Sequence, residues 1–244
     1  MHELVIFAAA VAAGAINAVA GGGTLVTVPV LIWLGIPSKL ANTTNTVALW
    51  PGSLGSAWGY RRELRDADRS LSALIVPSLF GGVLGAVLLQ WTPTEVFDRL
   101  VPVLILFATL LFMTQEPLQR RFNLAHTHRW WALVFQFAVG LYGGYFGAGI
   151  GILMLAALAL LGYTNIHQMN GVKNLLAVCI NGIAAIYFML AGLVLWSDAI
   201  VMAMGAVVGG VGGAGLARRA EPRTVRRIVV AIGFGMALSL MLRL

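Results

Sequence analysis

Two glycine clusters, GGG at residues 21–23 and GAGIG at residues 147–151, interrupt the two longest apolar runs of this 244-residue chain. Each is followed about twenty residues later by an asparagine-rich segment, ANTTNT at 41–46 and NGVKN at 170–174. Glycine and asparagine are unfavourable in hydrocarbon unless they serve packing, a turn or a ligand. The repetition therefore predicts two structural repeats around one shared site, an arrangement typical of secondary transporters.

The composition indicates a protein whose solvent is the lipid bilayer. The chain is 59% hydrophobic and 10% charged, with a mean hydropathy of +0.88, whereas a soluble domain carries about 25% charged residues. The net charge of +7 does not indicate a nucleic-acid partner, because the basic residues lie in short loops between apolar runs. Cys179 is the single cysteine, so no disulfide framework is expected.

Eight apolar runs divide the chain. Six have the length of one membrane-spanning helix, about 20 residues, whereas the first and fifth run over thirty residues and carry the glycine clusters at their middles. The runs cover residues 4–35, 41–60, 70–90, 96–114, 130–161, 168–191, 198–217 and 224–242.

The distribution of basic residues predicts the topology. Loops 61–69, 115–129 and 218–227 hold most of the sixteen Lys and Arg residues, which places all three in the cytoplasm. The second and third of these loops are separated by the long fifth run and two ordinary spans. They share a side only if the fifth run enters and returns on the same face, as a hairpin broken at 147–151. The same argument makes the first run a hairpin, broken at 21–23.

The predicted fold is an all-α membrane protein of two inverted repeats. Each repeat is a broken re-entrant helical hairpin followed by three transmembrane helices, and the two repeats begin on opposite sides of the membrane. The expected boundaries are 1–115 for the first repeat, 116–129 for a cytoplasmic linker and 130–244 for the second repeat. The alternative, in which each long run is one kinked helix, would place loops 61–69 and 218–227 on opposite faces.

The repeated motifs resemble the TauE/SafE (sulfite exporter) family. In the first half the resemblance rests on NAVAGGGT at 17–24, Pro29 and ANTTNT at 41–46; in the second it rests on GGYFGAGIG at 143–151 and NGVKN at 170–174. It spans nearly the whole chain. It implies a transporter of sulfur-containing anions, namely sulfite and organosulfonates, in the bacterial inner membrane as a multi-pass protein.

Lys173 is the clearest candidate for a ligand-binding side chain. No Asp or Glu lies inside a predicted span except at its ends, so a bound anion is the natural counter-ion of this lysine. The alternative is a lysine that snorkels to the interface. Aligning Asn42 with Asn170 makes Asn45 correspond to Lys173, and in both segments the polar residues fall at i, i+3 and i+4 on one helical face.

The glycine clusters complete the expected site. Half-helices that begin after Gly23 and near Gly149 would direct free N–H groups and positive dipole ends inward, toward an anion. The alternatives are close packing through small residues for the glycines and an ordinary hydrogen-bonded helix seam for the asparagines. The expected substrate-binding residues are Gly22, Gly23, Thr24, Asn42, Asn45, Thr46, Gly147, Gly149, Asn170, Lys173 and Asn174.

The predicted function is secondary active transport of sulfonates or sulfite, by alternating access around a site at the bilayer midplane. The partners expected are a small anion and the lipid bilayer; a monomer and a homo-oligomer are both compatible with the sequence. No cofactor, metal or catalytic residue is expected, because neither an HExxH motif nor a buried nucleophile–base pair is present. The alternatives are an anion channel, a transporter of a small carboxylate-type anion and a non-transporting partner protein.

Overall fold

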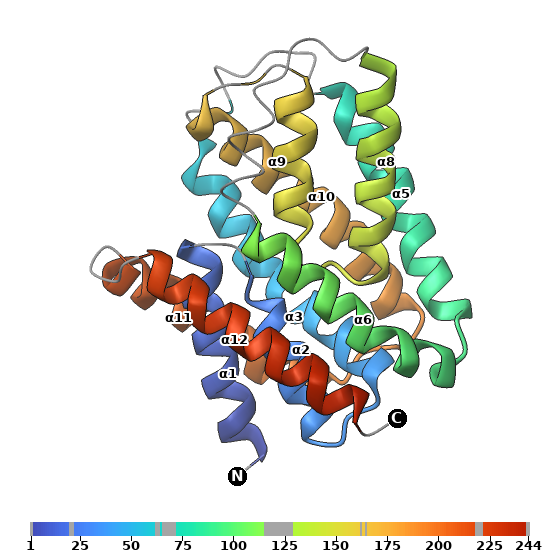
Figure 1. The fold of residues 1–244 in the computed structure, drawn as a ribbon, viewed down its shortest axis with the longest axis vertical. Helices are drawn as coiled ribbons and strands as arrows, with labels where there is room; N and C mark the ends of the chain where they lie inside the picture. Colours follow the sequence, from blue (N-terminus) through green and yellow to red (C-terminus); the bar gives the residue numbers. More distant parts are fainter. Residues whose placement is uncertain are drawn as a thin grey trace.

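A computed structural model shows an all-helical protein. It describes residues 2–19, 22–61, 64, 72–114, 129–161, 163, 165–217 and 222–242. These residues form ten α-helices, five in each half of the chain (Figure 1). The first half contains α1 (His2–Val19), α2 (Thr24–Trp33), α3 (Ser38–Gly59), α5 (Ser72–Trp91) and α6 (Thr94–Met113). The second contains α8 (Arg129–Tyr145), α9 (Ile150–Leu160), α10 (Ile166–Leu190), α11 (Trp196–Ala217) and α12 (Pro222–Met241).

The six ordinary apolar runs each form one helix of 20 to 25 residues, namely α3, α5, α6, α10, α11 and α12. Within the described residues, α5, α6 and α10 are both long enough and apolar enough to cross a membrane. Of the predicted linker 116–129, only Arg129 belongs to the described residues. Residues 62, 63 and 65–69 of the first basic loop and 218–221 of the third also lie outside them.

Each of the two long runs is divided into two helices at its glycine cluster. In the first run α1 ends at Val19 and α2 begins at Thr24; in the second α8 ends at Tyr145 and α9 begins at Ile150. The helices of each pair pack against each other. Figure 1 shows the α1–α2 pair in the lower part of the molecule and the α8–α9 pair in the upper part.

Helices from the two halves are packed closely together. α1 lies against α11, α5 lies against α8, and α3 crosses α10. Glycines permit the approach in the first two interfaces: a Cβ atom at Gly209 of α11 would lie 1.9 Å from the Val11 carbonyl oxygen, and one at Gly85 of α5 would lie 2.1 Å from that of Leu141. Backbone contact of this kind is the usual way in which membrane helices gain packing energy.

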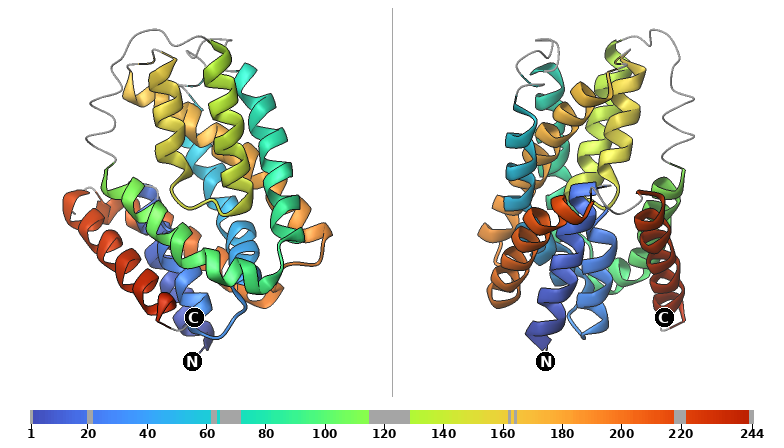
Figure 2. Two further views of the ribbon diagram at one scale, coloured as in Figure 1. Left: turned by 45° about the vertical axis from the view of Figure 1, so that its right-hand side comes forward. Right: turned by 90° about the vertical axis from the view of Figure 1, so that its left-hand side faces the viewer.

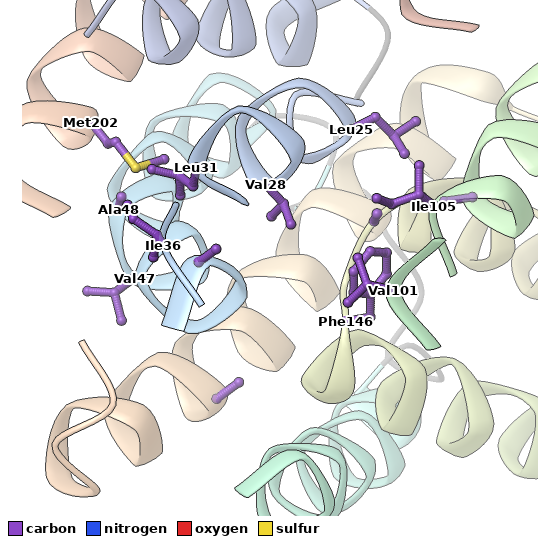
Figure 3. Packing of buried hydrophobic residues seen from close by; sticks show 14 of the residues in the cluster. Leu25, Val28, Leu31, Ile36, Val47, Ala48, Val101, Ile105, Phe146 and Met202 are labelled. Carbon is purple, nitrogen blue, oxygen red and sulfur yellow. The ribbon is translucent and has the colours of Figure 1, made fainter. Parts of the chain in front are cut away.

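The main buried cluster surrounds α6 and the two hairpins. Figure 3 shows Leu25 and Val28 from α2, Val101 and Ile105 from α6, and Phe146 from the end of α8 as members of this cluster. α6 also runs alongside α12 on one flank of the molecule (Figure 2). The ends of both hairpins are thus enclosed by side chains of the protein, as irregular backbone requires when water is absent.

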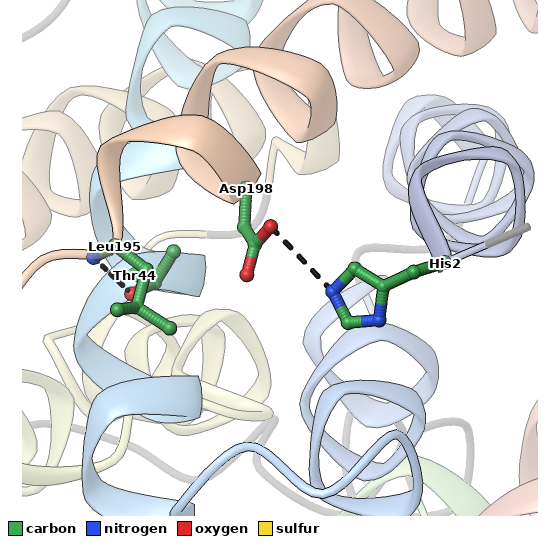
Figure 4. A network of polar contacts seen from close by, with 4 residues as sticks. All are labelled: His2, Thr44, Leu195 and Asp198. Atoms are coloured by element: carbon green, nitrogen blue, oxygen red, sulfur yellow. Dashed lines mark hydrogen bonds and ion pairs between the residues drawn. The ribbon is translucent and has the colours of Figure 1, made fainter.

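Polar contacts join the helices at the end that carries the N-terminus. The His2 imidazole lies 3.6 Å from the Asp198 carboxylate, which links α1 to α11 (Figure 4). The Leu195 amide donates to the Thr44 hydroxyl at 3.0 Å, which links the start of α11 to α3. Ser38 donates to Asp98 and so ties α3 to α6 near its start. Each of these two carboxylates lies near the start of a helix and has a polar partner from another helix.

The glycine contacts give a stability prediction. We expect Gly85→Ala to destabilise the protein by about 1–3 kcal/mol, because its methyl group would overlap the Leu141 carbonyl in the α5–α8 interface. Gly55→Ala is the matched control, since Gly55 lies in a helix with open space around its Cβ position. Thermal unfolding in detergent, followed by tryptophan fluorescence, measures both. Equal midpoints for the two variants would contradict the packing argument.

Candidate functional site

The turn between α8 and α9 is built by two glycines in the left-handed backbone region. Gly147 has φ +80° and Gly149 has φ +77°, conformations that side chains other than glycine rarely adopt. The Tyr142 hydroxyl donates to the Ala148 carbonyl at 2.8 Å and fixes the turn against α8. Successive residues that alternate in this way direct their N–H groups into a common concavity, which is a known anion-binding arrangement.

Several N–H groups of this turn have no hydrogen-bond acceptor. Within the described chain, the amides of Ala148, Gly149 and Gly151 donate to no protein group, and the Ile150 amide makes only a long bond of 3.4 Å to Gly147. The first four N–H groups of any α-helix lack a partner within the helix. At α9 these donors lie at the positive end of the helix dipole.

Lys173 brings a cation to the same turn. Its side chain runs past Gly151, where a Cβ atom would lie 3.2 Å from the Lys173 Cδ atom. Its ammonium group donates to the Asn170 side-chain oxygen at 3.0 Å, one turn earlier on α10. Among the described residues Lys173 makes no salt bridge. The predicted association of Lys173 with the second glycine cluster therefore has a geometric basis.

Asn42 reaches the same turn from α3. It is 1% exposed, and its side-chain NH₂ group donates to the Tyr145 carbonyl, immediately before the turn, at 3.0 Å. The oxygen of the same amide is buried and has no hydrogen-bond partner among the residues that the structure describes. If the Asn42 amide were rotated by 180°, its oxygen would face the Tyr145 carbonyl oxygen, and two acceptors cannot pair. The Tyr145 carbonyl therefore fixes which end of the amide carries the NH₂ group. An unsatisfied buried acceptor costs about 1–3 kcal/mol unless something pairs with it.

The turn between α1 and α2 is closed by its own side chains. The Gly23 amide donates to the Asn17 side-chain oxygen at 2.8 Å, and Thr27 donates to Asn45 at 2.5 Å. The Asn45 NH₂ group points to the Thr24 hydroxyl at 3.5 Å. The amides of residues 25–27 donate to the carbonyls of Gly22 and Gly23. In the described part of this turn the amides of Gly22 and Thr24 have no acceptor, against those of Ala148, Gly149 and Gly151 at the turn before α9.

α6 touches both turns. A Cβ atom at Gly22 would lie 2.9 Å from the Phe112 ring, and one at Gly149 would lie 3.6 Å from the Ala108 carbonyl. Since residues 108 and 112 are one helical turn apart, the two hairpin ends meet the same stretch of α6. The structure thus brings residues near 22–24 and 147–151 to one region, although they are more than one hundred residues apart.

The remaining predicted residues have simpler surroundings. The Thr46 hydroxyl donates to the Asn42 carbonyl of its own helix at 2.9 Å, and Asn174 is half-buried on α10. The described residues contain no group of His, Cys, Asp and Glu that could hold a metal ion. Sequence reasoning did not identify Asn17, Thr27 or Tyr142 as residues that fix the two turns. For Thr27, a signal was its spacing of three residues from Thr24, on the same helical face.

The closed network at the first turn gives a second stability prediction. We expect Asn45→Ala to destabilise the protein by about 1–3 kcal/mol, because it removes the partners of Thr27 and Thr24 in a buried place. Thr46→Val is the control and should change stability by less than about 0.5 kcal/mol, since the Thr46 hydroxyl bonds only within its own helix. Thermal midpoints measured in one detergent compare the two variants. A smaller shift for Asn45→Ala than for Thr46→Val would show that this network is dispensable.

Comparison with known proteins assigns the family. The family model described as "Sulfite exporter TauE/SafE" matches residues 6–240, nearly the whole chain. The chain is 29% identical over 242 residues to a probable membrane transporter protein of Haemophilus influenzae, a match covering 95% of this chain and 91% of that protein. It is 28% identical over 245 residues to the probable membrane transporter protein YfcA of Escherichia coli, covering 97% and 88%.

A third relative is the probable membrane transporter protein ORF9 of Sinorhizobium sp., 25% identical over 240 residues. That match covers 97% of this chain and 91% of the relative. No solved structure gives a significant match. The helical architecture, the apolar helices and the family match agree with one another. The chain therefore belongs to the TauE/SafE sulfite exporter family and is a multi-pass membrane transporter rather than an enzyme.

Proposed function

We propose that this protein is a secondary active transporter of small sulfur-containing anions, sulfite or organosulfonates, which bind at the turn before α9. The observation that carries the proposal is the position of Lys173 beside a turn in which the amides of Ala148, Gly149 and Gly151 have no acceptor in the described chain. A sulfonate or sulfite group offers several acceptor oxygens and a negative charge, so it complements both the free N–H groups and the ammonium.

We further propose that residues 1–115 and 130–244 are inverted repeats, joined by a cytoplasmic linker at 116–129. The packing supports this. If each helix of the first half is matched with the helix at the same place in the second half, most helix–helix contacts have a counterpart. α1 against α11 is the counterpart of α8 against α5, and α3 against α11 is the counterpart of α10 against α5. α2 against α12 is likewise the counterpart of α9 against α6, while α3 and α10 pack on each other. This pattern is expected of an internal pseudo-two-fold axis.

In the membrane, α1–α2 and α8–α9 would be re-entrant hairpins from opposite sides. The exposed tryptophans support this placement. Trp33, Trp91 and Trp196 lie at the helix ends near the N-terminus, whereas Trp58 and Trp130 lie at the other end of the molecule (Figure 1). Tryptophan side chains favour the two membrane–water interfaces. The hairpin ends would then lie between these two levels, near the bilayer midplane.

The predicted site residues divide into two groups in this proposal. Those at the second turn and on α10 would contact the anion directly: Gly147, Gly149, Asn170, Lys173 and Asn174. Those at the first turn and on α3 would form the facing wall, from which Asn42 also reaches the anion: Gly22, Gly23, Thr24, Asn42, Asn45 and Thr46. The division follows from the charge and the hydrogen bonds, because Lys173 lies at the second turn while Asn17 and Asn45 pair with groups of the first.

Alternating access would consist of one repeat rocking against the other around this site. Close packing between the halves would form the rocking surface. Trp50 of α3, for example, donates to the Val178 carbonyl of α10 at 3.2 Å, and its ring packs where Gly182 has no side chain. Exported anions would also gain about 2.3 kcal/mol per charge for each 100 mV of an inside-negative potential.

The topology predicts which exposed positions react with a membrane-impermeant maleimide. In a Cys179→Ser background, we expect Ser197→Cys to be labelled in intact cells, and Arg61→Cys and Arg227→Cys only after permeabilisation. All three side chains are exposed. Labelling of Arg61→Cys and Arg227→Cys from opposite sides would favour kinked single helices instead of hairpins.

The anion site predicts a large effect at Lys173. We expect Lys173→Ala to weaken the binding of sulfite or simple sulfonates at least tenfold, since a hydrogen bond to a charged group contributes about 1.5–3 kcal/mol. Lys173→Arg should keep part of the affinity. Calorimetry on purified protein measures binding, and counterflow in proteoliposomes measures transport; saturable counterflow distinguishes a transporter from an anion channel.

A matched control exists because the chain has only two lysines. Lys39, at the start of α3, donates to the carbonyls of Gln90 and Thr92 at 2.8 Å and 2.6 Å, away from either turn. Lys39→Ala should leave anion affinity within about twofold of the parent protein. Equal losses in the two lysine variants, or tighter binding of carboxylates than of sulfonates, would contradict the proposed site or its substrate class.

A further inference from the structure

We infer that the transported anion carries a hydrogen-bond donor in addition to its acceptor oxygens, and that the Asn42 side-chain oxygen receives this donor. The inference rests on the proposed function and narrows its substrate class. The ligand would be a small oxyanion with an O–H or N–H group, either as a substituent on a sulfonate or as the proton of a hydrogen-sulfite-like anion.

The unpaired oxygen of Asn42 is the first step of the argument. The residue is 1% exposed, and its NH₂ group is held by the Tyr145 carbonyl at 3.0 Å. The oxygen of the same planar amide therefore lies within a few ångströms of the turn that begins after Tyr145. Among the described residues, the only other buried side-chain oxygen or nitrogen without a partner is Oε1 of Gln136. That residue lies in the α5–α8 interface and bonds Ser78, so it does not belong to this turn.

The second step is the mixture of polar groups at the turn. Ala148, Gly149 and Gly151 supply free N–H donors and Lys173 supplies a cation, all of which require acceptors. The Asn42 oxygen requires a donor. A fully deprotonated oxyanion without substituents satisfies the first set and leaves the Asn42 oxygen unpaired, at a cost of about 1–3 kcal/mol. An anion with its own donor satisfies both sets at once.

The third step is the contrast with Asn45, one turn further along α3. Asn45 is as deeply buried, at 2% exposed, but its oxygen accepts from Thr27 and its NH₂ group faces Thr24. An unpaired amide oxygen is thus not a general feature of the asparagines in this segment. It occurs at the residue that bonds the second turn, where the free N–H groups are.

A matched pair of ligands tests the inference. 2-Hydroxyethanesulfonate and propane-1-sulfonate have nearly the same shape and charge and differ by a hydroxyl in place of a methyl group. We expect the hydroxyl compound to bind the parent protein about 10- to 100-fold more tightly, because a site built around a buried acceptor rejects the analogue that leaves it unpaired. Sulfite measured below and above the pKa of hydrogen sulfite forms a second arm, which tests whether the anion's own proton serves as the donor.

The variant Asn42→Ala should abolish these preferences by removing the acceptor. Thr44→Val is the control: Thr44 is buried on the same helix, and its hydroxyl accepts from the Leu195 amide, away from the turn. This variant should keep the parent ratio even where it lowers stability. Each affinity is measured by calorimetry in sodium and in a large organic cation.

The outcomes separate this inference from the function on which it rests. A preference in either arm that disappears in Asn42→Ala supports it. The parent protein could bind the two sulfonates equally, and sulfite equally at both pH values, while Lys173→Ala still weakens binding. That result would overturn the donor requirement and leave anion transport standing. Loss of sodium dependence in Asn42→Ala, without a change in ligand ratio, would assign the oxygen to a cation and also overturn it. Absence of binding by every anion would instead defeat the proposed function.

Discussion

The structure depends on how the backbone is satisfied where two long apolar helices are broken. Each break exposes N–H and C=O groups that a continuous helix would have paired, and a bilayer offers no water to replace them. At the first break Asn17, Thr24, Thr27 and Asn45 pair with the described backbone and with one another. At the second break several N–H groups remain unpaired, beside Lys173. A bound anion would satisfy them, so the incomplete hydrogen bonding and the proposed function have a common origin.

Two halves with the same order of helices therefore differ where the ligand would lie. Asn45 on α3 corresponds in the sequence to Lys173 on α10, but the first pairs with neutral hydroxyl groups while the second passes a glycine. The second half thus has a cation, Lys173, where the first half has the neutral amide of Asn45. One of the two turns is positively charged by a side chain, and the other is not. In the proposed mechanism this asymmetry favours a single anion held between the halves, and the shared framework would supply the symmetry that rocking requires.

Close backbone packing is what allows these elements to meet. In the α1–α11 and α5–α8 interfaces a single methyl group at Gly209 or Gly85 would lie about 2 Å from a carbonyl oxygen. The helices are thus held by many weak contacts over a large area rather than by strong polar bonds. Polar links join the halves as well, among them Trp50 to Val178 and Asn42 to Tyr145, and His2 to Asp198 at the end that carries the N-terminus.

The sequence alone determined the helix content, the positions of the breaks and the family, because hydrophobic run length, glycine clusters and the NGVKN and ANTTNT motifs are local features. It also identified Lys173, since an isolated cation in an apolar run needs no structure to be noticed. The tertiary structure decided that Lys173 passes Gly151, that Asn42 bonds Tyr145 and that Phe112 and Ala108 meet the two turns. It also decided that the two turns are unequal, which their similar glycine clusters concealed. The physical reason is that hydrogen-bond satisfaction depends on partners distant in the chain, and a local pattern of residues does not specify which groups folding will pair.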